Sequence, residues 1–372
     1  MTQYLLLNET ELKQKNAYWT AREISQQPES WCNTAAIIET HRAEINAFLA
    51  PLLPLKELQI VLTGAGTSAY VGEVLAPHLT AKTDLNVRAV STTDIVSNPH
   101  GFLQKGTPTL LISYARSGNS PESVAAVDIA EQVVEKCYHL VITCNESGEL
   151  AKRAAIKSNS FSVLMPKETL DESFAMTSSF TSMLLSTLCI FTLDVNQLTQ
   201  VTRQTEQLLE TQLDEIRNFA QTDIERLVFL GAGSLIGYAK EAALKCLELT
   251  NGDLISYFET PLGFRHGPKT IINDKTAVLL MASSDFYSSL YDADLYNELL
   301  NDQQCSAVKK LALNSELVEL DDVWQGLYYI VYCQIFAFYK SMSLGLTPDN
   351  PCPTGEVNRV VKGVTIYPLT SR

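Results

Sequence analysis

Short apolar runs alternate along the chain with longer stretches in which apolar and polar residues recur at helical spacing. The clearest runs lie at 60–63, 87–91, 109–113, 139–143, 228–230 and 277–282. Strands that alternate with helices form parallel sheets covered by helices. The pattern therefore predicts an α/β fold.

One motif occurs twice. Gly64-Ala-Gly66 follows the run at 60–63, and Gly231-Ala-Gly233 follows the run at 228–230, each leading through hydroxyl residues into a helical stretch. This repetition predicts two tandem domains, each a parallel sheet flanked by helices in a flavodoxin-like or Rossmann-like three-layer sandwich. We expect a helical leader over 1–53, a first domain over 54–200 and a second over 201–372.

Composition and charge argue against some classes of function. The 372 residues are 46% hydrophobic and 19% charged, as in a packed globular protein. The net charge of -14, without a Lys/Arg cluster, argues against a nucleic-acid partner. The longest apolar segment, near 181–193, is shorter than the roughly 20 residues of a membrane-spanning helix, and residues 1–15 lack a signal-peptide pattern. We expect a cytoplasmic protein without membrane association.

The glycine turns do not predict a nucleotide cofactor. Gly64-Ala-Gly66 lacks the third glycine of a dinucleotide fingerprint, and Ser91-Thr-Thr93 stands where an acidic residue would end the next strand. A tight turn without a ligand is the commoner interpretation. The eight cysteines are scattered without a C-x-x-C pair, so they are expected to be reduced. We expect no metal and no cofactor.

The loop after 109–113 has a sequence typical of an anion-binding site. It reads Arg116-Ser-Gly-Asn-Ser120-Pro-Glu and leads into a helix. Hydroxyl residues and glycine at a helix N-terminus supply donors where the dipole favours an anion such as a phosphomonoester. A serine N-cap followed by proline explains the same residues without a ligand. The matching loop, Ser283-Ser-Asp285, carries a negative charge, so one phosphate site per chain is expected, in the first half.

The second half carries its candidate chemistry on a helix and a loop. Glu241, Lys245 and Glu248 stand at i, i+4 and i+7 on one helix face, directly after the second glycine turn, where open α/β sheets place ligands. A solvated Glu–Lys stripe is the ordinary interpretation of that spacing. His266 lies in a loop bracketed by glycine and proline, as either a structural hydrogen-bonding residue or a functional one.

Together these motifs resemble the sugar-isomerase (SIS) domain proteins, and specifically the isomerase half of glucosamine-6-phosphate synthase. The Phe-Arg-His-Gly-Pro and Ser-Gly-Asn-Ser-Pro-Glu loops resemble the branch of tagatose-6-phosphate ketose/aldose isomerases and galactosamine-6-phosphate deaminases. The resemblance implies two tandem SIS domains. It implies phosphate binding by Ser68, Ser117 and Ser120, and catalysis by Glu248, His266, Lys362, Glu241 and Lys245. Ala115-Arg116 departs from the family by lengthening the phosphate loop and adding a cation, and we expect Thr67, Asn119 and Arg116 to help bind the phosphate.

The chemistry of such a site gives each residue a role. Glu248 is expected to move a proton between C1 and C2, and His266 to open the sugar ring. Glu241 and Lys245 are expected to orient the site and balance its charge. The resemblance to the synthase implies that Lys362 approaches C1–C2, as an imine-forming amine. In the family the histidine comes from the neighbouring subunit. A homodimer or larger assembly with shared active sites, acting on a sugar 6-phosphate, is therefore expected.

The expected reaction converts galactosamine 6-phosphate to tagatose 6-phosphate and ammonia. The synthase carries a glutaminase domain, whereas this chain begins Met1-Thr-Gln, so no internal ammonia source and the ammonia-releasing direction are expected. Two alternatives stay open: a ketose/aldose isomerase that releases no ammonia, and a non-catalytic sugar-phosphate sensor. A sensor needs the phosphate loop but not the acid–base residues.

Overall fold

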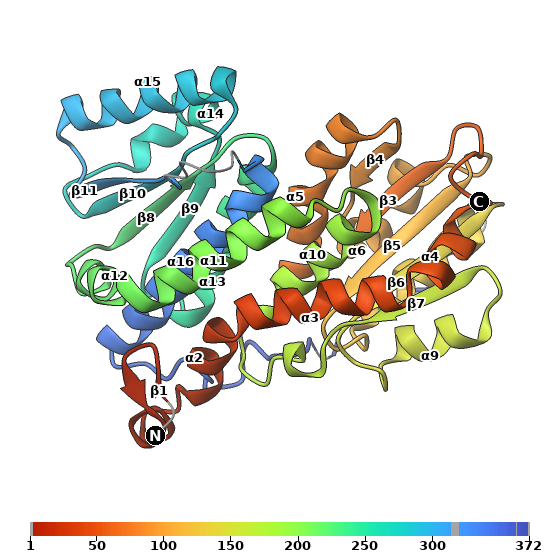
Figure 1. Ribbon diagram of the computed structural model, residues 1–372, viewed down its shortest axis with the longest axis horizontal. Coiled ribbons are helices and arrows are strands. Elements are labelled where there is room, and N and C mark those ends of the chain that lie inside the picture. Colours follow the sequence, from red (N-terminus) through yellow and green to blue (C-terminus); the bar gives the residue numbers. More distant parts are fainter. Residues whose placement is uncertain (1–2, 314–319, 362, 371–372) are drawn as a thin grey trace. The chain divides into compact units, whose positions relative to one another are not determined.

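The computed structural model describes residues 3–313, 320–361 and 363–370. These fall into two compact units. Unit 1 contains the described residues of Met1–Pro28, Glu172–Thr177 and Asp194–Thr354, and unit 2 those of Glu29–Asp171, Ser178–Leu193 and Gly355–Arg372. Each unit contains a parallel sheet with helices against it (Figure 1), which confirms the expected α/β class. The domain boundaries after residues 53 and 200 remain a prediction.

Unit 2 is built on a five-stranded parallel sheet with the order β4-β3-β5-β6-β7. Its strands are β3 (Gln59–Thr63), β4 (Asn86–Ala89), β5 (Thr109–Ala115), β6 (Cys137–Thr143) and β7 (Ser160–Leu164). Its helices are α4 (Arg42–Leu49), α5 (Thr67–Lys82), α6 (Thr92–Ser97), α7 (Pro99–Phe102), α8 (Pro121–Val133), α9 (Glu149–Ile156), α10 (Ser178–Phe191), most of α3 (Gln27–Thr40), and the short η1 (Lys167–Thr169). The four apolar runs of the first half thus became β3 to β6.

Successive side chains along each strand point to opposite faces of this sheet, so each strand contributes to the packing on both faces. On one face, an added Cβ at Gly72 of α5 would lie 2.9 Å from Leu62 Cβ, so only glycine allows this approach. On the same side, the Tyr114 hydroxyl lies 2.9 Å from Thr187 Oγ1 of α10. On the other face, Val61 and Leu111 belong to a buried cluster that includes alanines of α8. The result is a three-layer sandwich.

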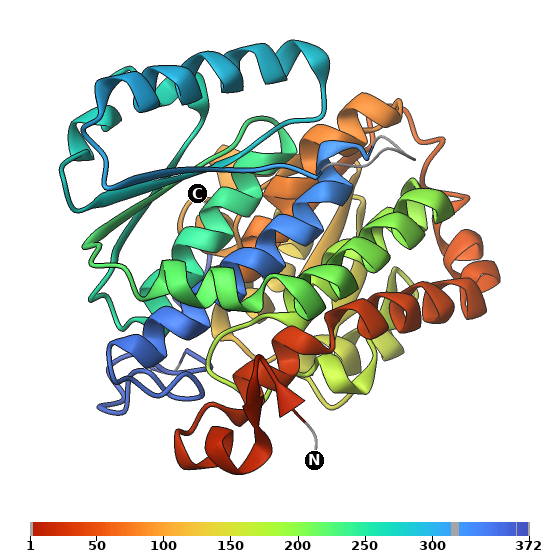
Figure 2. The same cartoon turned by 60° about the vertical axis from the view of Figure 1, so that its left-hand side comes forward.

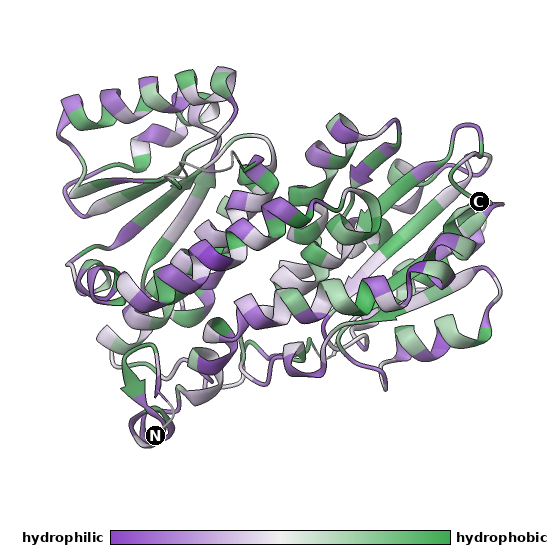
Figure 3. Ribbon diagram, in the orientation of Figure 1, coloured by the Kyte–Doolittle hydropathy of each residue, from purple (hydrophilic) through white to green (hydrophobic). Residues whose placement is uncertain are grey.

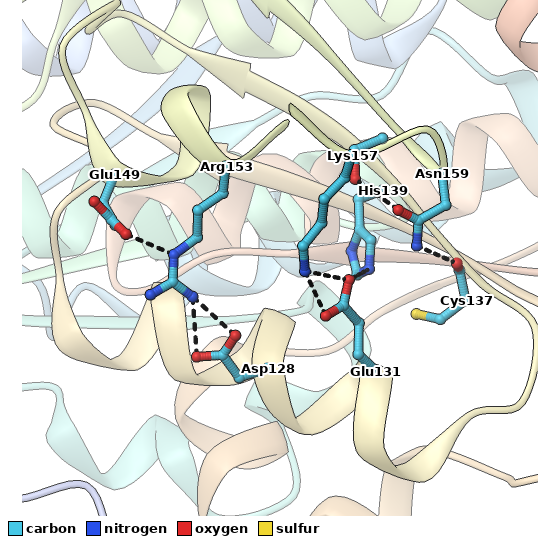
Figure 4. A network of polar contacts seen from close by, with 9 residues as sticks. Asp128, Glu131, Cys137, His139, Glu149, Arg153, Lys157 and Asn159 are labelled. Carbon is cyan, nitrogen blue, oxygen red and sulfur yellow. Dashed lines mark hydrogen bonds and ion pairs between the residues drawn. The ribbon is translucent and has the colours of Figure 1, made fainter. Parts of the chain in front are cut away.

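A polar network joins α8, β6 and the end of α9 (Figure 4). His139 of β6 is 1% exposed, and its Nε2 lies 3.4 Å from Glu131 Oε1. Burial lowers the pKa of His139 to about 4, although Glu131 opposes the shift. Burial raises the pKa of Glu131, but Lys157, which donates to both its oxygens at 2.7 and 2.6 Å, leaves it below its ordinary value. His139 is therefore neutral in the folded protein at neutral pH.

We expect this histidine to make unit 2 less stable in mild acid. In the unfolded chain His139 takes up a proton near its ordinary pKa, whereas the folded form does so only near 4, so stability is complete above pH 6.5 and falls as pH approaches 4. The free energy of unfolding should drop by about 2 kcal/mol between pH 7 and pH 5. Urea unfolding at both pH values measures this. His139→Gln should have a shallower pH dependence, and an identical slope in the variant would contradict the assignment.

Unit 1 contains a four-stranded parallel sheet with the order β11-β10-β8-β9. Its strands are β8 (Arg226–Leu230), β9 (Ile255–Glu259), β10 (Thr276–Met281) and β11 (Ala307–Leu311), and a separate antiparallel pair is formed by β1 (Gln3–Tyr4) and β2 (Leu7–Asn8). Its helices are α1 (Glu9–Gln14), α2 (Tyr18–Ser25), α11 (Val195–Thr211), α12 (Leu213–Ala220), α13 (Ser234–Leu249), α14 (Pro261–Phe264), α15 (Phe286–Asp302), α16 (Asp322–Ser343) and the short η2 (Pro268–Ile271).

The sheet of unit 1 also lies between two helical layers. Phe264 of α14 and Leu295 and Leu299 of α15 pack with Val228 and Val278 on one face. α13 and α16 lie on the other side of the sheet (Figure 2). The central strands of both sheets are mostly hydrophobic, while polar residues line the outer helices (Figure 3). Both sheets therefore have buried faces, as parallel sheets require.

Two expectations about the whole chain concern its cysteines and its longest apolar segment. All eight cysteines are free thiols, and most are buried. The apolar segment near 181–193 forms most of α10, which packs inside unit 2. Among the residues that the structure describes, no helix has both the length and the apolar character needed to span a membrane.

Candidate functional site

The strand order places candidate ligand sites in each sheet. In unit 2 the chain passes from β3 to β4 on one side and from β5 to β6 on the other side, so the order of the strands reverses between β3 and β5. In unit 1 it reverses in the same way between β8 and β10. Open α/β sheets bind ligands at this switch point, outside the carboxyl ends of the strands. The two predicted loops of the phosphate site follow β3 and β5 directly.

The first loop brings backbone donors and hydroxyls to the start of α5. Gly66 has φ +55°, and Gly64 packs so closely that an added Cβ would lie 2.5 Å from the carbonyl carbon of Ser68. A side chain is thus excluded at Gly64, and Thr67 and Ser68 form the first turn of the helix. Both are nearly buried, at 4% and 5% exposure. Helix N-termini are positions at which proteins bind anions, so phosphate binding at this loop stays a prediction.

The second loop is a hydroxyl-rich entry into α8. Ser120 is the N-cap and accepts a hydrogen bond from Ser123 N at 3.3 Å, with Pro121 at the first helical position. Gly118 has φ +66°, and Asn119 N donates to Ser117 Oγ at 3.3 Å. The capping interpretation of these residues is therefore correct. It does not conflict with anion binding, because a cap uses only part of the donor set at a helix N-terminus.

The loop after β6 holds this second loop in place, a role that the sequence did not reveal. Asn145 Nδ2 donates to Ser117 O at 2.8 Å. Glu149 N donates to Asn119 Oδ1 at 2.9 Å, so the side-chain oxygen of Asn119 helps to hold the two loops together. An added Cβ at Gly148 would lie 2.5 Å from Ser117 O. The available signal was the position of Asn145 just beyond the end of a predicted strand.

Arg116 is the buried cation of the loop, with 6% exposure. Its Nη2 donates to the carbonyl oxygen of Arg359 at 2.8 Å. The Arg359 side chain in turn donates to the carbonyl oxygen of Asp171. The guanidinium thus links the phosphate loop to the C-terminal segment. A role for Arg116 in phosphate binding stays a prediction.

The matching loop of unit 1 is occupied by a side chain of the protein itself. Asp322 Oδ1 accepts from Ser284 N at 2.8 Å, and its Oδ2 accepts from Ser283 Oγ at 2.7 Å. Ser283 N donates to Asp292 Oδ2 at 2.7 Å. Two carboxylates therefore take the donors that a phosphate would need, which supports the prediction of a single phosphate loop per chain.

The helix α13 carries a buried cluster of charges, so the ordinary interpretation of a solvated stripe is wrong. Glu241 and Lys245 have fully buried side chains, and Lys245 Nζ lies 3.4 Å from Glu241 Oε1. Lys245 also contacts Glu248, whose side chain is 23% exposed. Buried charges are tolerated when they are paired. Glu248 alone of the three carries an accessible carboxylate, so it is the one that can meet a substrate.

His266 lies between α14 and η2 and is exposed. Thr260 caps α14 by accepting from Gly263 N at 3.1 Å, and His266 N donates to Gly263 O at 2.9 Å. Gly267 follows with φ +120°. An exposed histidine on a tight turn can act on a molecule outside its own unit. The remaining predicted residue, Lys362, lies outside the described residues.

Comparison with known proteins identifies the family. The SIS domain model matches residues 55–193. A relative from Shewanella sp. (strain ANA-3), named D-galactosamine-6-phosphate deaminase AgaS, is 52% identical over 98% of this chain and 96% of its own. The chain belongs to the AgaS family of SIS-domain proteins. A second AgaS relative of the same name, from Escherichia coli, is 44% identical over 94% of this chain and 96% of its own.

A solved structure has the same fold as this chain over nearly its whole length. The crystal structure of a tagatose-6-phosphate ketose/aldose isomerase from Escherichia coli has a TM-score of 0.89 to this chain at 41% identity, covering 95% of this chain and 97% of the other. The expected class of tandem SIS domains with parallel sheets is thereby confirmed. The two names given to such similar proteins correspond to the deaminase and isomerase functions considered from the sequence.

Proposed function

We propose that this protein converts galactosamine 6-phosphate and water to tagatose 6-phosphate and ammonia. The observation that carries the proposal is the full-length similarity, at 44–52% identity, to relatives named galactosamine-6-phosphate deaminases. The paired charges on α13 and the two hydroxyl loops of unit 2 supply groups suited to this chemistry. We place the protein in the cytoplasm as a homodimer or larger assembly.

Unit 2 holds the substrate by its phosphate in this proposal. Ser68, Ser117 and Ser120 donate to the phosphate oxygens, with Thr67, Asn119 and Arg116 as helpers. What supports this is the position of both loops beside the switch point, each at the start of a helix whose dipole favours an anion. The shape of the second loop, fixed by Asn145, keeps its donors oriented before the ligand arrives.

The residues of unit 1 carry the proton transfers. Glu248 takes the proton from C2 of the open-chain aldehyde, giving an enolamine, and delivers a proton to C1. The C2 amine is then a ketimine, which water hydrolyses to the ketone and ammonia. Lys245 orients the Glu248 carboxylate, and the buried Glu241 balances the charge of Lys245. Lys362 assists at C1–C2 as an amine.

His266 supplies the acid–base group for ring opening, because imidazole exchanges protons near neutral pH. Its exposure on this chain supports a role in the active site of a neighbouring subunit. Particular observations bear on the two alternative functions. The name of the similar Escherichia coli structure favours a ketose/aldose isomerase that releases no ammonia. A non-catalytic sensor is disfavoured by the buried Glu241–Lys245 pair, which phosphate recognition alone does not require.

Ammonia release from a panel of sugars tests the proposal. Galactosamine 6-phosphate should yield equal amounts of ammonia and ketose, while unphosphorylated galactosamine should react poorly at the same concentration because it lacks the group that the loops bind. N-acetylgalactosamine 6-phosphate has no free amine and should release no ammonia. Glucosamine 6-phosphate measures the preference at C4. Interconversion of a ketose and an aldose phosphate, with no ammonia from any hexosamine 6-phosphate, would establish the isomerase instead.

A further inference from the structure

The loop that carries His266 is attached to α15 through a shared carboxylate. Arg265, directly before His266, donates from Nε to Glu298 Oε2 at 2.8 Å. Lys269, three residues after His266, contacts the other oxygen of the same carboxylate, Glu298 Oε1. His266 is therefore bracketed by two cations that meet at one side chain.

Two further carboxylates of α15 also form ion pairs with Arg265 and Lys269. Asp294, Glu298 and Asp302 stand at i, i+4 and i+8 and so share one helix face. Asp294 Oδ2 accepts from Arg265 Nη2 at 2.8 Å, and Asp302 Oδ2 accepts from Lys269 Nζ at 2.5 Å. Isolated surface ion pairs contribute little, but a network with fixed geometry can restrain a loop. Glu298 is the member that touches both cations.

The backbone on either side of His266 connects these ion pairs to the position of its imidazole. Phe264 is fully buried in the cluster that includes Leu295 and Leu299 of α15, which anchors the loop on the N-terminal side. Gly267 has φ +120°, a conformation open mainly to glycine, and its carbonyl oxygen accepts from Thr270 N at 3.0 Å, so the backbone turns sharply between His266 and η2. The direction of the imidazole then depends on what holds the residues on either side.

We propose that Glu298 is a positioning residue for His266. Through Arg265 and Lys269 it fixes the chain before and after the histidine, so that the imidazole is presented in one orientation. Glu298 itself touches no substrate. The catalytic consequence rests on the ring-opening role of His266 in the proposed function, whereas the structural consequence does not.

Glu298→Gln keeps the shape of the side chain and removes the charge that both cations share. We expect kcat for ammonia release to fall on the order of 10-fold with little change in KM, because misplacement of a reacting group lowers the rate and the phosphate contacts are untouched. Glu215→Gln is the matched control. It removes a comparable ion pair, with Lys309 at 2.8 Å, and should leave kcat unchanged.

A double-mutant cycle with His266→Ala separates positioning from a general structural effect. In the His266→Ala background, Glu298→Gln should cause no further loss, because the effect passes through the imidazole. Additive losses would overturn the proposal, as would an unchanged kcat in the single variant. Lys269→Arg keeps a cation at the bracket and should behave like the unaltered protein, whereas Lys269→Met should resemble Glu298→Gln.

The NMR signal of the His266 ring tests the proposal without substrate. The Cε1–H resonance is assigned by its absence in His266→Ala, and it should shift or broaden in Glu298→Gln but not in Glu215→Gln. An identical signal in Glu298→Gln would refute positioning. If the protein releases no ammonia from any hexosamine 6-phosphate, the proposed function fails, while the ring signal still decides whether Glu298 orients His266.

Discussion

Replacement of Glu248 by glutamine should lower kcat for ammonia release by at least about 10²-fold, the usual contribution of general acid–base catalysis. The amide has the size of the carboxylate but cannot accept the C2 proton. KM should change little, because the hydroxyl loops that are expected to bind the phosphate belong to unit 2 and remain intact. Steady-state kinetics with galactosamine 6-phosphate measure both constants.

Isotope exchange gives this prediction a second, independent readout. In deuterated water the unaltered protein should place deuterium at C1 of the ketose, since the proton delivered there comes from the carboxyl group and exchanges with solvent. Glu248→Gln should lose this incorporation together with turnover. Glu206→Gln, on an exposed position of α11, serves as the control. Normal kcat in Glu248→Gln would assign the proton transfer to another residue.

The sequence predicted six of the strands and the two glycine turns because both depend on local patterns, whereas β7, β9 and β11 were not predicted. Apolar runs bounded by turns became β3 to β6, β8 and β10, and both Gly-Ala-Gly turns lead into a helix, α5 or α13. The position of Glu241, Lys245 and Glu248 on one face of α13 follows from helical spacing alone. In each case a short stretch of chain contains all the information that the prediction needs.

The burial of the charges on α13 was not predictable in the same way. One helix that packs against α13 is α16, which begins more than 70 residues after α13 ends. Tyr238 of α13 donates to Val323 O at 2.7 Å, and an added Cβ at Gly326 would lie 2.0 Å from the Tyr238 ring. Only the folded chain shows that α16 closes over α13. Spacing identifies which residues share a face but not whether that face meets water.

The supporting residues of the loops were missed for a related reason. Asn145 acts on Ser117 from the next strand, and Asp322 occupies the loop at Ser283 and Ser284 from the start of a distant helix. Neither residue belongs to a recognisable motif. Their roles follow from the parallel sheet, which brings the carboxyl ends of successive strands together regardless of the length of chain between them.

The second large effect concerns stability. Lys245→Met should lower the free energy of unfolding by about 3–5 kcal/mol, because removal of one partner of a buried ion pair takes away the attraction that offset the desolvation of the other charge. Here the carboxylate of the partly exposed Glu248 can be hydrated, whereas Glu241 is fully buried and loses its ion pair with Lys245. Urea unfolding should show a clear fall in the transition midpoint.

The double variant Glu241→Gln, Lys245→Met separates the charge effect from simple loss of packing. It removes both members of the buried pair, so much of the lost stability should return, since buried neutral side chains of similar size need no compensating charge. Its activity should not return, because Glu248 still lacks the lysine that orients it. An unchanged midpoint in Lys245→Met would mean that water reaches Glu241. Recovery of stability without recovery of turnover would show that the lysine serves the reaction through Glu248 and the fold through Glu241.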